Sequence, residues 1–465
     1  MFAAAQTLGS YPTAPEIQEG ASVPSSQGPF GGSVAQGKAT GTVLPLSFKD
    51  AIERGLQNNL GVLLQSDNNI AVRGQKWNEL SSLLPNLSAD ISENAAQVNL
   101  ATVGIRFTKT SFAGIPTIVG PFGFFDSRFY LTQNLFNLKD INRVRAATSN
   151  EKAAQYSYKD ARDLVVLAVG NAYLQTLAGA ARVDTAEAQV ETAQALFDKS
   201  LAQQNAGVSP AIDTLRSRVE LQSRQQQLIV ARNDYAKEKL ALARAIGLPA
   251  GQEFSLSDKA PYEPFPTVSL EQNLQRAYAS RSDYQAALQQ VRAAQLFRNA
   301  ATAENYPYID VEANYGDSGV NIGNSHGVFA VAGTLHIPIL QGGKIHADVL
   351  QAEAQLRQSE QQLDNLRGQI DYDVRTALLD LNAAADQVEV ARSSVDLANE
   401  TLSQARDRFA AGVTDNLEVI QAQESVASAN ENYISSLYAH NLAKVELSRA
   451  VGYAEQGVKE YLKSK

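Results

Sequence analysis

An internal duplication limits what this chain of 465 residues can fold into more than any other feature. Ala206-Gly207-Val208-Ser209 in the first half corresponds to Ala411-Gly412-Val413-Thr414 in the second half. Ala245-Ile246-Gly247 corresponds to Ala450-Val451-Gly452 at the same spacing. Similarity at a constant spacing indicates that one structural unit is built two times.

The front parts of the two copies also correspond. Leu46-Ser47-Phe48 matches Val268-Ser269-Leu270, and the segment around Pro85 matches the segment around Pro307. The spacing then changes, because the first copy holds about 18 more residues than the second before Leu135. These extra residues fall near 98–124, where we expect an elaborated loop or a longer hairpin.

Each copy predicts the same order of elements: helix, strand, strand, very long helix, shorter helix. Ser47 and Ser269 are suited to cap the first helix, which we expect to end at Pro85 or Pro307. Glycine ends the last helix of each copy. The predicted segments are a flexible lead 1–44, a first repeat 45–250, a linker 251–266, a second repeat 267–455 and a tail 456–465.

Alternating side chains predict four strands. After Pro307, apolar residues such as Ile309 and Val311 alternate with polar residues such as Asp310 and Glu312. Period two is typical of a strand with one apolar face, and segments of about ten residues fit a tilted membrane strand. A soluble antiparallel sheet packed on helices is the alternative.

Four strands are too few to close a membrane barrel. A bilayer tolerates no open sheet edge, because unpaired backbone groups have no water to bind there. If these strands cross a membrane, several chains must therefore contribute to one barrel.

The helices predicted after the strands are too long for an ordinary globular domain. From Leu138 to Ala206 only isolated glycines interrupt the helical composition, which corresponds to about 100 Å of helix. In the second copy an apolar stripe steps by three or four residues from Leu363 to Phe409. Such a stripe predicts coiled-coil packing, in a channel wall or in an ordinary soluble coiled coil.

Gly207 and Gly412 stand where each long helix is expected to fold back on the next. A tight turn between helices needs a residue that tolerates a positive φ, and glycine does. The turn is therefore predicted either as a plain helical hairpin or as an exposed tip that docks a partner.

Composition excludes several classes of function. The chain has no cysteine, so disulfides and thiolate metal sites are absent, and its net charge of −9 offers no basic face for nucleic acid. Its four histidines have no partner at zinc-site spacing, and no phosphate-binding or nucleophile motif is present. We expect no catalytic residue, no metal and no cofactor.

The ends of the printed chain give little information. No stretch approaches 18 consecutive apolar residues, so we expect no transmembrane helix. The first residues lack the charged and apolar regions of a signal peptide. Either the chain is cytoplasmic, or Met1 stands where a signal peptide has been removed, and we favour the second interpretation.

The chain resembles the TolC family of outer-membrane efflux and secretion channels, over roughly residues 45–455. The resemblance is carried by the duplicated order of elements, by Leu46-Ser47-Phe48, and by Ala411-Gly412-Val413-Thr414 followed by Asn416–Gln423. It implies a mainly α fold with a membrane β part. It also implies a trimer that forms a twelve-stranded β-barrel and a long periplasmic α-barrel.

The resemblance also implies roles for particular residues. The tips that dock a periplasmic adaptor would be Ala206, Gly207, Val208, Ser209, Ala411, Gly412, Val413 and Thr414. The acidic periplasmic entrance would lie at Asp213, Glu418 and Gln421, although glutamine at 421 departs from the aspartate of many relatives. The polar residues expected to keep the barrel lumen wet are Asp90, Asp126, Arg128, Asp310 and Glu312.

We therefore predict a passive outer-membrane exit duct of a tripartite efflux pump. It would carry small molecules from a periplasmic adaptor and an inner-membrane transporter to the exterior of a Gram-negative-type cell. One alternative is the outer-membrane component of a type I protein secretion system. An alternative of another class is a soluble or surface coiled-coil scaffold.

Overall fold

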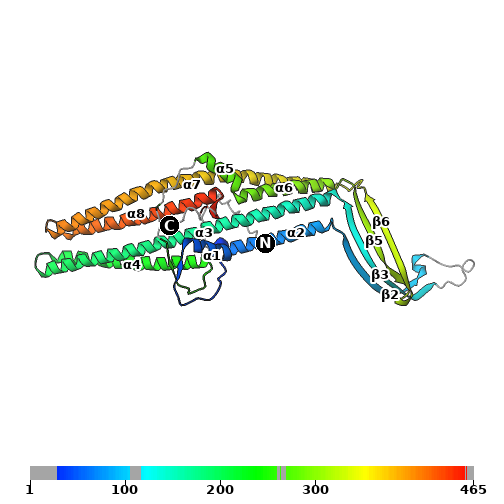
Figure 1. Cartoon of the computed structure of the whole chain (residues 1–465), viewed down its shortest axis with the longest axis horizontal. Helices are drawn as coiled ribbons and strands as arrows, with labels where there is room; N and C mark the ends of the chain where they lie inside the picture. The colour runs from blue at the N-terminus through cyan, green and yellow to red at the C-terminus, as the bar shows by residue number, and fades with distance from the viewer. Residues whose placement is uncertain (1–28, 105–116, 259–261, 263–268, 456, 458–465) are drawn as a thin grey trace, which may run out of the picture. The chain divides into compact units, whose positions relative to one another are not determined.

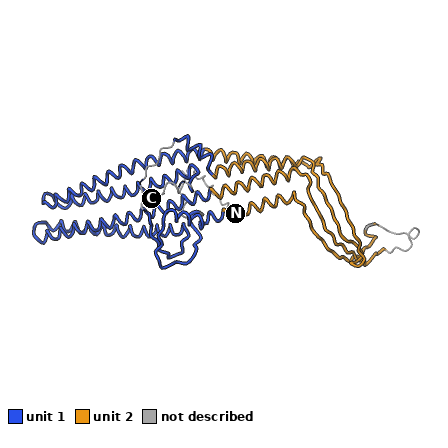
Figure 2. The backbone as a smooth tube through the Cα atoms, in the orientation of Figure 1, with its two compact units in different colours: residues 1–64, 160–281, 368–465 blue, residues 65–159, 282–367 orange. Residues whose placement is uncertain are grey.

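The computed structural model describes residues 29–104, 117–258, 262, 269–455 and 457. It contains two compact units (Figure 2). Unit 1 comprises residues 1–64, 160–281 and 368–465, and unit 2 comprises residues 65–159 and 282–367. Each unit takes segments from both halves of the sequence, as expected when two copies of one motif pair along their length.

The order of elements is duplicated, as the sequence predicted (Figure 1). The first copy runs α1 (Phe48–Asn58), α2 (Leu60–Ser81), β2 (Asn86–Asn99), β3 (Ile118–Phe136), α3 (Leu138–Asn205) and α4 (Ala211–Ala245). The second copy runs α5 (Leu270–Ser280), α6 (Ser282–Ala303), β5 (Tyr308–Gly319), β6 (Ser325–His336), α7 (Lys344–Ala410) and α8 (Asn416–Ala450). The fold class, mainly α with a β part built twice, is confirmed.

The prediction of a single helix up to each proline was wrong. In the first copy the helix stops at Asn59, whose backbone is extended. The buried Asn59 amide donates to the Phe30 carbonyl at 2.8 Å, and its Oδ1 accepts from the Gly61 amide. These side-chain bonds compete with the helix, so the chain breaks there and starts α2. Arg281 marks the corresponding break between α5 and α6.

Unit 2 contains a four-stranded antiparallel sheet in the order β2-β3-β5-β6. The strands are longer than the alternating pattern suggested, and the β2–β3 pairing continues to Asn99 opposite Ile118. Part of the extra sequence near 98–124 therefore lengthens this hairpin, whereas residues 105–116 lie outside the described part of the chain.

Most of unit 1 consists of two helical hairpins, α3 with α4 and α7 with α8 (Figure 1), although α3 and α7 each begin in unit 2. The predicted long helices are confirmed, at 68 residues for α3 and 67 residues for α7. The apolar stripe of α7 is buried at most of its expected positions, including Ile370, Val374 and Val388. Small residues share the stripe, which lets neighbouring helices approach closely.

The core of unit 1 lies beside a short parallel pair of strands, β1 (Leu44–Leu46) and β4 (Phe254–Leu256). The Tyr173 hydroxyl donates to Asp258 Oδ2 at 3.0 Å, and the Phe48 backbone N–H donates to the same oxygen at 2.6 Å. Asp258 thereby attaches the segment that joins the two repeats to the start of the first helix.

The described part of the predicted lead also belongs to this core. The backbone N–H of Ser33 donates to Arg244, and that of Val34 donates to Asn58. These bonds attach residues 29–44 to α1 and to the end of α4, whereas residues 1–28 lie outside the described part of the chain.

Within the described residues one helix, α3, is long and apolar enough to cross a membrane by composition alone. The best window of α3 has a mean hydropathy of 1.5, and 56% of it is buried inside the structure. The sequence prediction of no transmembrane helix overlooked this window because isolated polar residues interrupt it. Val165, Val166 and Val169 are buried there, so packing accounts for the apolar composition.

Candidate functional site

Each predicted tip is a helix end closed by a left-handed glycine. Gly207 has φ +75° and Gly412 has φ +71°. Val208 N–H donates to the Gln203 carbonyl, and Val413 N–H donates to the Arg408 carbonyl, both at 3.0 Å. These are the backbone bonds of a Schellman ending, so glycine is needed at both turns for the same reason.

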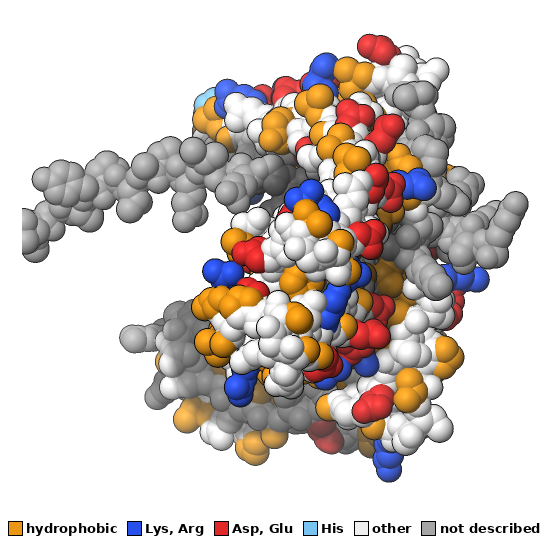
Figure 3. All heavy atoms as spheres, turned by 90° about the vertical axis from the view of Figure 1, so that its left-hand side faces the viewer, with side chains coloured by type: hydrophobic (Ala, Val, Ile, Leu, Met, Phe, Trp, Pro, Cys, Tyr) orange, Lys and Arg blue, Asp and Glu red, His pale blue; other side chains and the backbone are white. Residues whose placement is uncertain are grey.

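The two turns present apolar side chains to solvent. Val208 is 75% exposed and Val413 is 68% exposed. A Cβ atom added to Gly207 or Gly412 would meet nothing within 4 Å. Figure 3 views the end of the molecule at which the turns lie, and hydrophobic patches are interspersed there with charges of both signs.

The three residues predicted at the entrance lie in different environments. Asp213 is only 4% exposed, and its Oδ2 accepts a hydrogen bond from the Ser209 hydroxyl at 2.9 Å. Glu418 is half-buried and Gln421 is exposed. Asp213 is thus part of the packing at the start of α4, whereas Glu418 is partly open to solvent and Gln421 faces solvent on α8.

The turns of the two repeats are joined directly. The Asn416 side chain, which is fully buried, donates to the Asp213 backbone carbonyl at 2.6 Å. The Arg216 Nη1 atom lies 3.6 Å from Asp213 and 3.5 Å from Asp415. Sequence reasoning missed Asn416, Asp415 and Arg216, because their partners lie on the other copy of the repeat.

Glu418 forms an ion pair within its own repeat. The Nε atom of Arg408, at the end of α7, lies 3.2 Å from Glu418 Oε1. A hydrogen bond from the Thr414 side chain, together with the charge of Arg408, lowers the pKa of Glu418. Glu418 is therefore ionised at neutral pH.

The five residues predicted to line a lumen lie on one face of the sheet. Asp90 is opposite Arg128 across β2 and β3, and Arg128 is opposite Gly316 across β3 and β5. Because side chains alternate along a strand, Asp126, Asp310 and Glu312 share the face of Arg128. The Arg128 Nε donates to Asp126 Oδ1 at 2.7 Å, so these two charges neutralise each other, and three further acidic side chains share the face.

The other face of the sheet is apolar and largely uncovered. It carries several large hydrophobic side chains that are each more than half exposed, among them Leu87, Ile91, Phe129, Tyr315, Phe329, Val331 and Leu335. A soluble protein rarely leaves so large an apolar patch in water. Together with the charged opposite face, this pattern matches a barrel strand with lipid on one side and water on the other.

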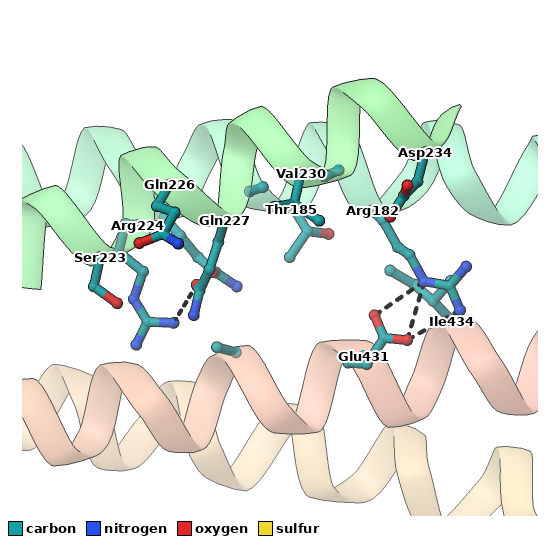
Figure 4. A pocket seen from close by; sticks show the side chains of 14 residues that line it. Arg182, Thr185, Ser223, Arg224, Gln226, Gln227, Val230, Asp234, Glu431 and Ile434 are labelled. Carbon is teal, nitrogen blue, oxygen red and sulfur yellow. Dashed lines mark hydrogen bonds and ion pairs between the residues drawn. The ribbon is translucent and has the colours of Figure 1, made fainter. Parts of the chain in front are cut away.

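A polar pocket of about 690 Å³ lies between α3, α4 and α8 (Figure 4). Arg182 on α3 points across it and donates to Glu431 on α8 at 3.0 Å. Arg224 on α4 is held by Glu220 at 2.5 Å and by Gln227 at 2.9 Å. One ion pair, Arg182 with Glu431, therefore bridges the two helical hairpins across this space, whereas the contacts of Arg224 lie within α4.

Among the described residues, no group of three or more histidine, aspartate or glutamate side chains is placed to hold a metal ion. His336 lies 2.8 Å from Asp310 and stacks on Tyr308. It therefore belongs to a side-chain pair on the polar face of the sheet.

Comparison with known proteins agrees with this geometry. The chain is 22% identical to the outer membrane protein TolC of Escherichia coli, over 69% of this chain and 68% of TolC. It is 21% identical to the alkaline protease secretion protein AprF of Pseudomonas aeruginosa, over 90% of this chain and 88% of AprF. It is 22% identical to TtgC of Pseudomonas putida, a probable efflux pump outer membrane protein, over 87% of this chain and 83% of TtgC.

The fold is shared with solved outer-membrane channels. The CmeC outer membrane channel of Campylobacter jejuni superposes with a TM-score of 0.75 at 16% identity, covering 97% of each chain. The profile of the outer membrane efflux protein family matches residues 125–248 and 273–453. The chain thus belongs to the outer membrane efflux protein family and is an efflux duct of the outer membrane.

Proposed function

We propose that this duct is the passive exit of a tripartite efflux pump that carries small molecules. In this proposal a periplasmic adaptor docks on the helical tips, and an inner-membrane transporter supplies the energy. The observation that carries the proposal is the two-faced sheet, which has charges on one face and exposed large apolar side chains on the other. No phosphate-binding motif is present in the sequence, so the energy must come from a partner.

The open edges of the sheet support assembly into a trimer. β2 and β6 each pair with one neighbour only within the described sheet. An unpaired edge cannot remain in lipid, so the edge strands must pair with other copies of the chain. Three copies supply twelve strands, and their charged faces, including Asp90, Arg128 and Glu312, would line the lumen.

The turns support docking of the adaptor. Val208 and Val413 offer apolar anchors on rigid helix ends, and the glycines leave open space beside them. Exposed apolar side chains held by a fixed backbone are suited to binding a partner at little entropic cost. We place the adaptor contact at residues 206–209 and 411–414.

The contacts at the helix starts support a gate. Arg216, held between Asp213 and Asp415, joins the two hairpins, and Arg408 holds Glu418. A movement that separates the hairpins must break the first of these contacts. We propose that docking of the adaptor favours the separated arrangement, and that Glu418 then faces the entering substrate.

Export in cells tests the docking proposal. Replacing Gly412 with leucine forces a side chain into a left-handed backbone and should abolish efflux of small-molecule dyes by cells lacking their own duct. Gly368→Leu is the matched control, because Gly368 lies within α7 with nothing within 4 Å of an added Cβ. Normal export by the Gly412→Leu variant with its adaptor would contradict the proposed docking site.

Protein secretion is the second candidate, since the relative AprF is named as an alkaline protease secretion protein. The same cells can be tested with a secreted protease and its own transporter in place of the dye pump. Dye efflux without protease release supports the proposal, and protease release without dye efflux favours the secretion duct.

A further inference from the structure

A second cavity, of about 450 Å³, lies in the helical part of unit 1 and has no role in the proposed duct. It takes its walls from α3, α4, α7 and α8, and it shares Thr185, Gln189 and Arg224 with the pocket in Figure 4. Its volume falls in the range of small-molecule sites. A cavity of this size between four helices needs an occupant that suits its walls.

Gln423 is the residue in these walls that most requires a partner. It is 7% exposed, and neither its Nε2 nor its Oε1 has a hydrogen-bond partner among the described residues. Burying an amide without hydrogen bonds costs free energy. Its neighbours Val419 and Ala422 are buried apolar residues, so an apolar side chain would pack at position 423 at lower cost.

The charges around the cavity balance. Arg224 is neutralised by Glu220, 2.5 Å away. Arg406 and Asp184 also contribute to the walls and carry opposite charges. Leu402 and Val426 add an apolar surface. The cavity therefore favours an uncharged molecule with a polar end and a short apolar body.

We propose that this cavity binds a small uncharged molecule bearing a planar amide-type group, such as a carboxamide, a lactam or a urea. Such a group both donates and accepts in one plane, which complements the carboxamide of Gln423. Its apolar body would lie against Leu402 and Val426. A molecule bound there contacts both hairpins, so it would stabilise the arrangement of helices that it fits.

Benzamide is a suitable probe, because it combines a primary carboxamide with an apolar ring. The full-length protein in detergent should bind it saturably in calorimetric titration, and more tightly than benzoate or toluene. Gln423→Leu should weaken the binding at least tenfold. Gln421→Leu is the matched control, since Gln421 is exposed two positions earlier on α8, and it should bind like the wild type.

Two results would overturn the proposal. One is a titration result: the absence of saturable benzamide binding would leave a cavity filled with water only, and equal binding by the Gln423→Leu variant would show that Gln423 does not hold the amide. The other comes from melting without ligand, where Gln423→Leu should be at least as stable as the wild type. A clearly lower melting temperature would assign the amide a structural role in its place.

Discussion

At the scale of residues, Asp163 on α3 lies in an unusual environment for a carboxyl group. Asp163 is buried, and its Oδ1 accepts from the backbone N–H of Glu455 at 3.3 Å. Burial raises the pKa of Asp163 to about 6, although the nearby Arg449 acts in the opposite direction. A carboxyl with a raised pKa stabilises the fold when protonated, and this contribution is lost as pH rises from about 4 through 6.

Replacing Asp163 with asparagine should therefore stabilise the protein at neutral pH, by on the order of 2–3 kcal/mol for a pKa shift of this size. This gain in stability over the wild type should disappear near pH 4, where the wild-type carboxyl is protonated. Thermal unfolding at both pH values measures this difference.

Asp160→Asn is the control, because Asp160 pairs with Arg449 at 2.5 Å, and this variant should be destabilised at neutral pH. An Asp163→Asn protein that melts below the wild type at neutral pH would contradict a raised pKa of Asp163.

The break at Asn59 shows what sequence reasoning could not supply at this scale. Serine caps, proline stops and left-handed glycines act on neighbouring backbone, so they predicted the starts of helices and the turns at Gly207 and Gly412. Asn59 depends on the carbonyl of Phe30, and Asp213 depends on Asn416. No local pattern carries such distant contacts, so the sequence did not predict that Asp213 is buried.

At the scale of elements, one carboxylate joins three segments where helices and strands meet. Glu304, just after α6, accepts from Lys139 at the start of α3 at 2.8 Å and from Lys344 at the start of α7 at 3.3 Å. Partial burial raises the pKa of Glu304, but the hydrogen bonds from the two lysines outweigh it, so the pKa is lowered. This stabilisation is present above the unfolded pKa and is lost as pH falls below it.

Glu304→Gln should thus lower stability at neutral pH by about 1–3 kcal/mol, the usual cost of losing hydrogen bonds to charged groups. The difference from wild type should shrink in acid. Glu353→Gln removes a more exposed pair with Arg298 and should cost less than about 1 kcal/mol. Equal effects of both variants on the melting temperature would show that Glu304 has no special role at this junction.

The contacts between the hairpins give a second prediction at this scale. Arg216→Ala removes the cation between Asp213 and Asp415, so the tips should separate more readily. The conductance of the Arg216→Ala variant in planar lipid bilayers should rise above that of the wild type. Arg232→Ala, which removes an exposed pair with Glu187 farther along α4, should leave conductance unchanged, and a rise in both variants would contradict a specific gate.

At the scale of the whole molecule, the duplication predicted the fold well, since two copies of one order of elements leave few alternatives. The long helices followed from the absence of breakers, and the strand faces followed from alternation at period two. Sequence alone could not decide between a soluble sheet and a membrane sheet. That distinction depends on which face is covered, and the structure leaves Leu87, Tyr315 and Phe329 exposed.

Assembly of three chains into one barrel is the central claim, and electron microscopy of the detergent-extracted protein tests it most directly. We predict particles with threefold symmetry and a detergent belt around the strands, in which β2 of one copy pairs with β6 of the next. Monomers that stay in solution without detergent would contradict the barrel, and they would favour the soluble coiled-coil scaffold.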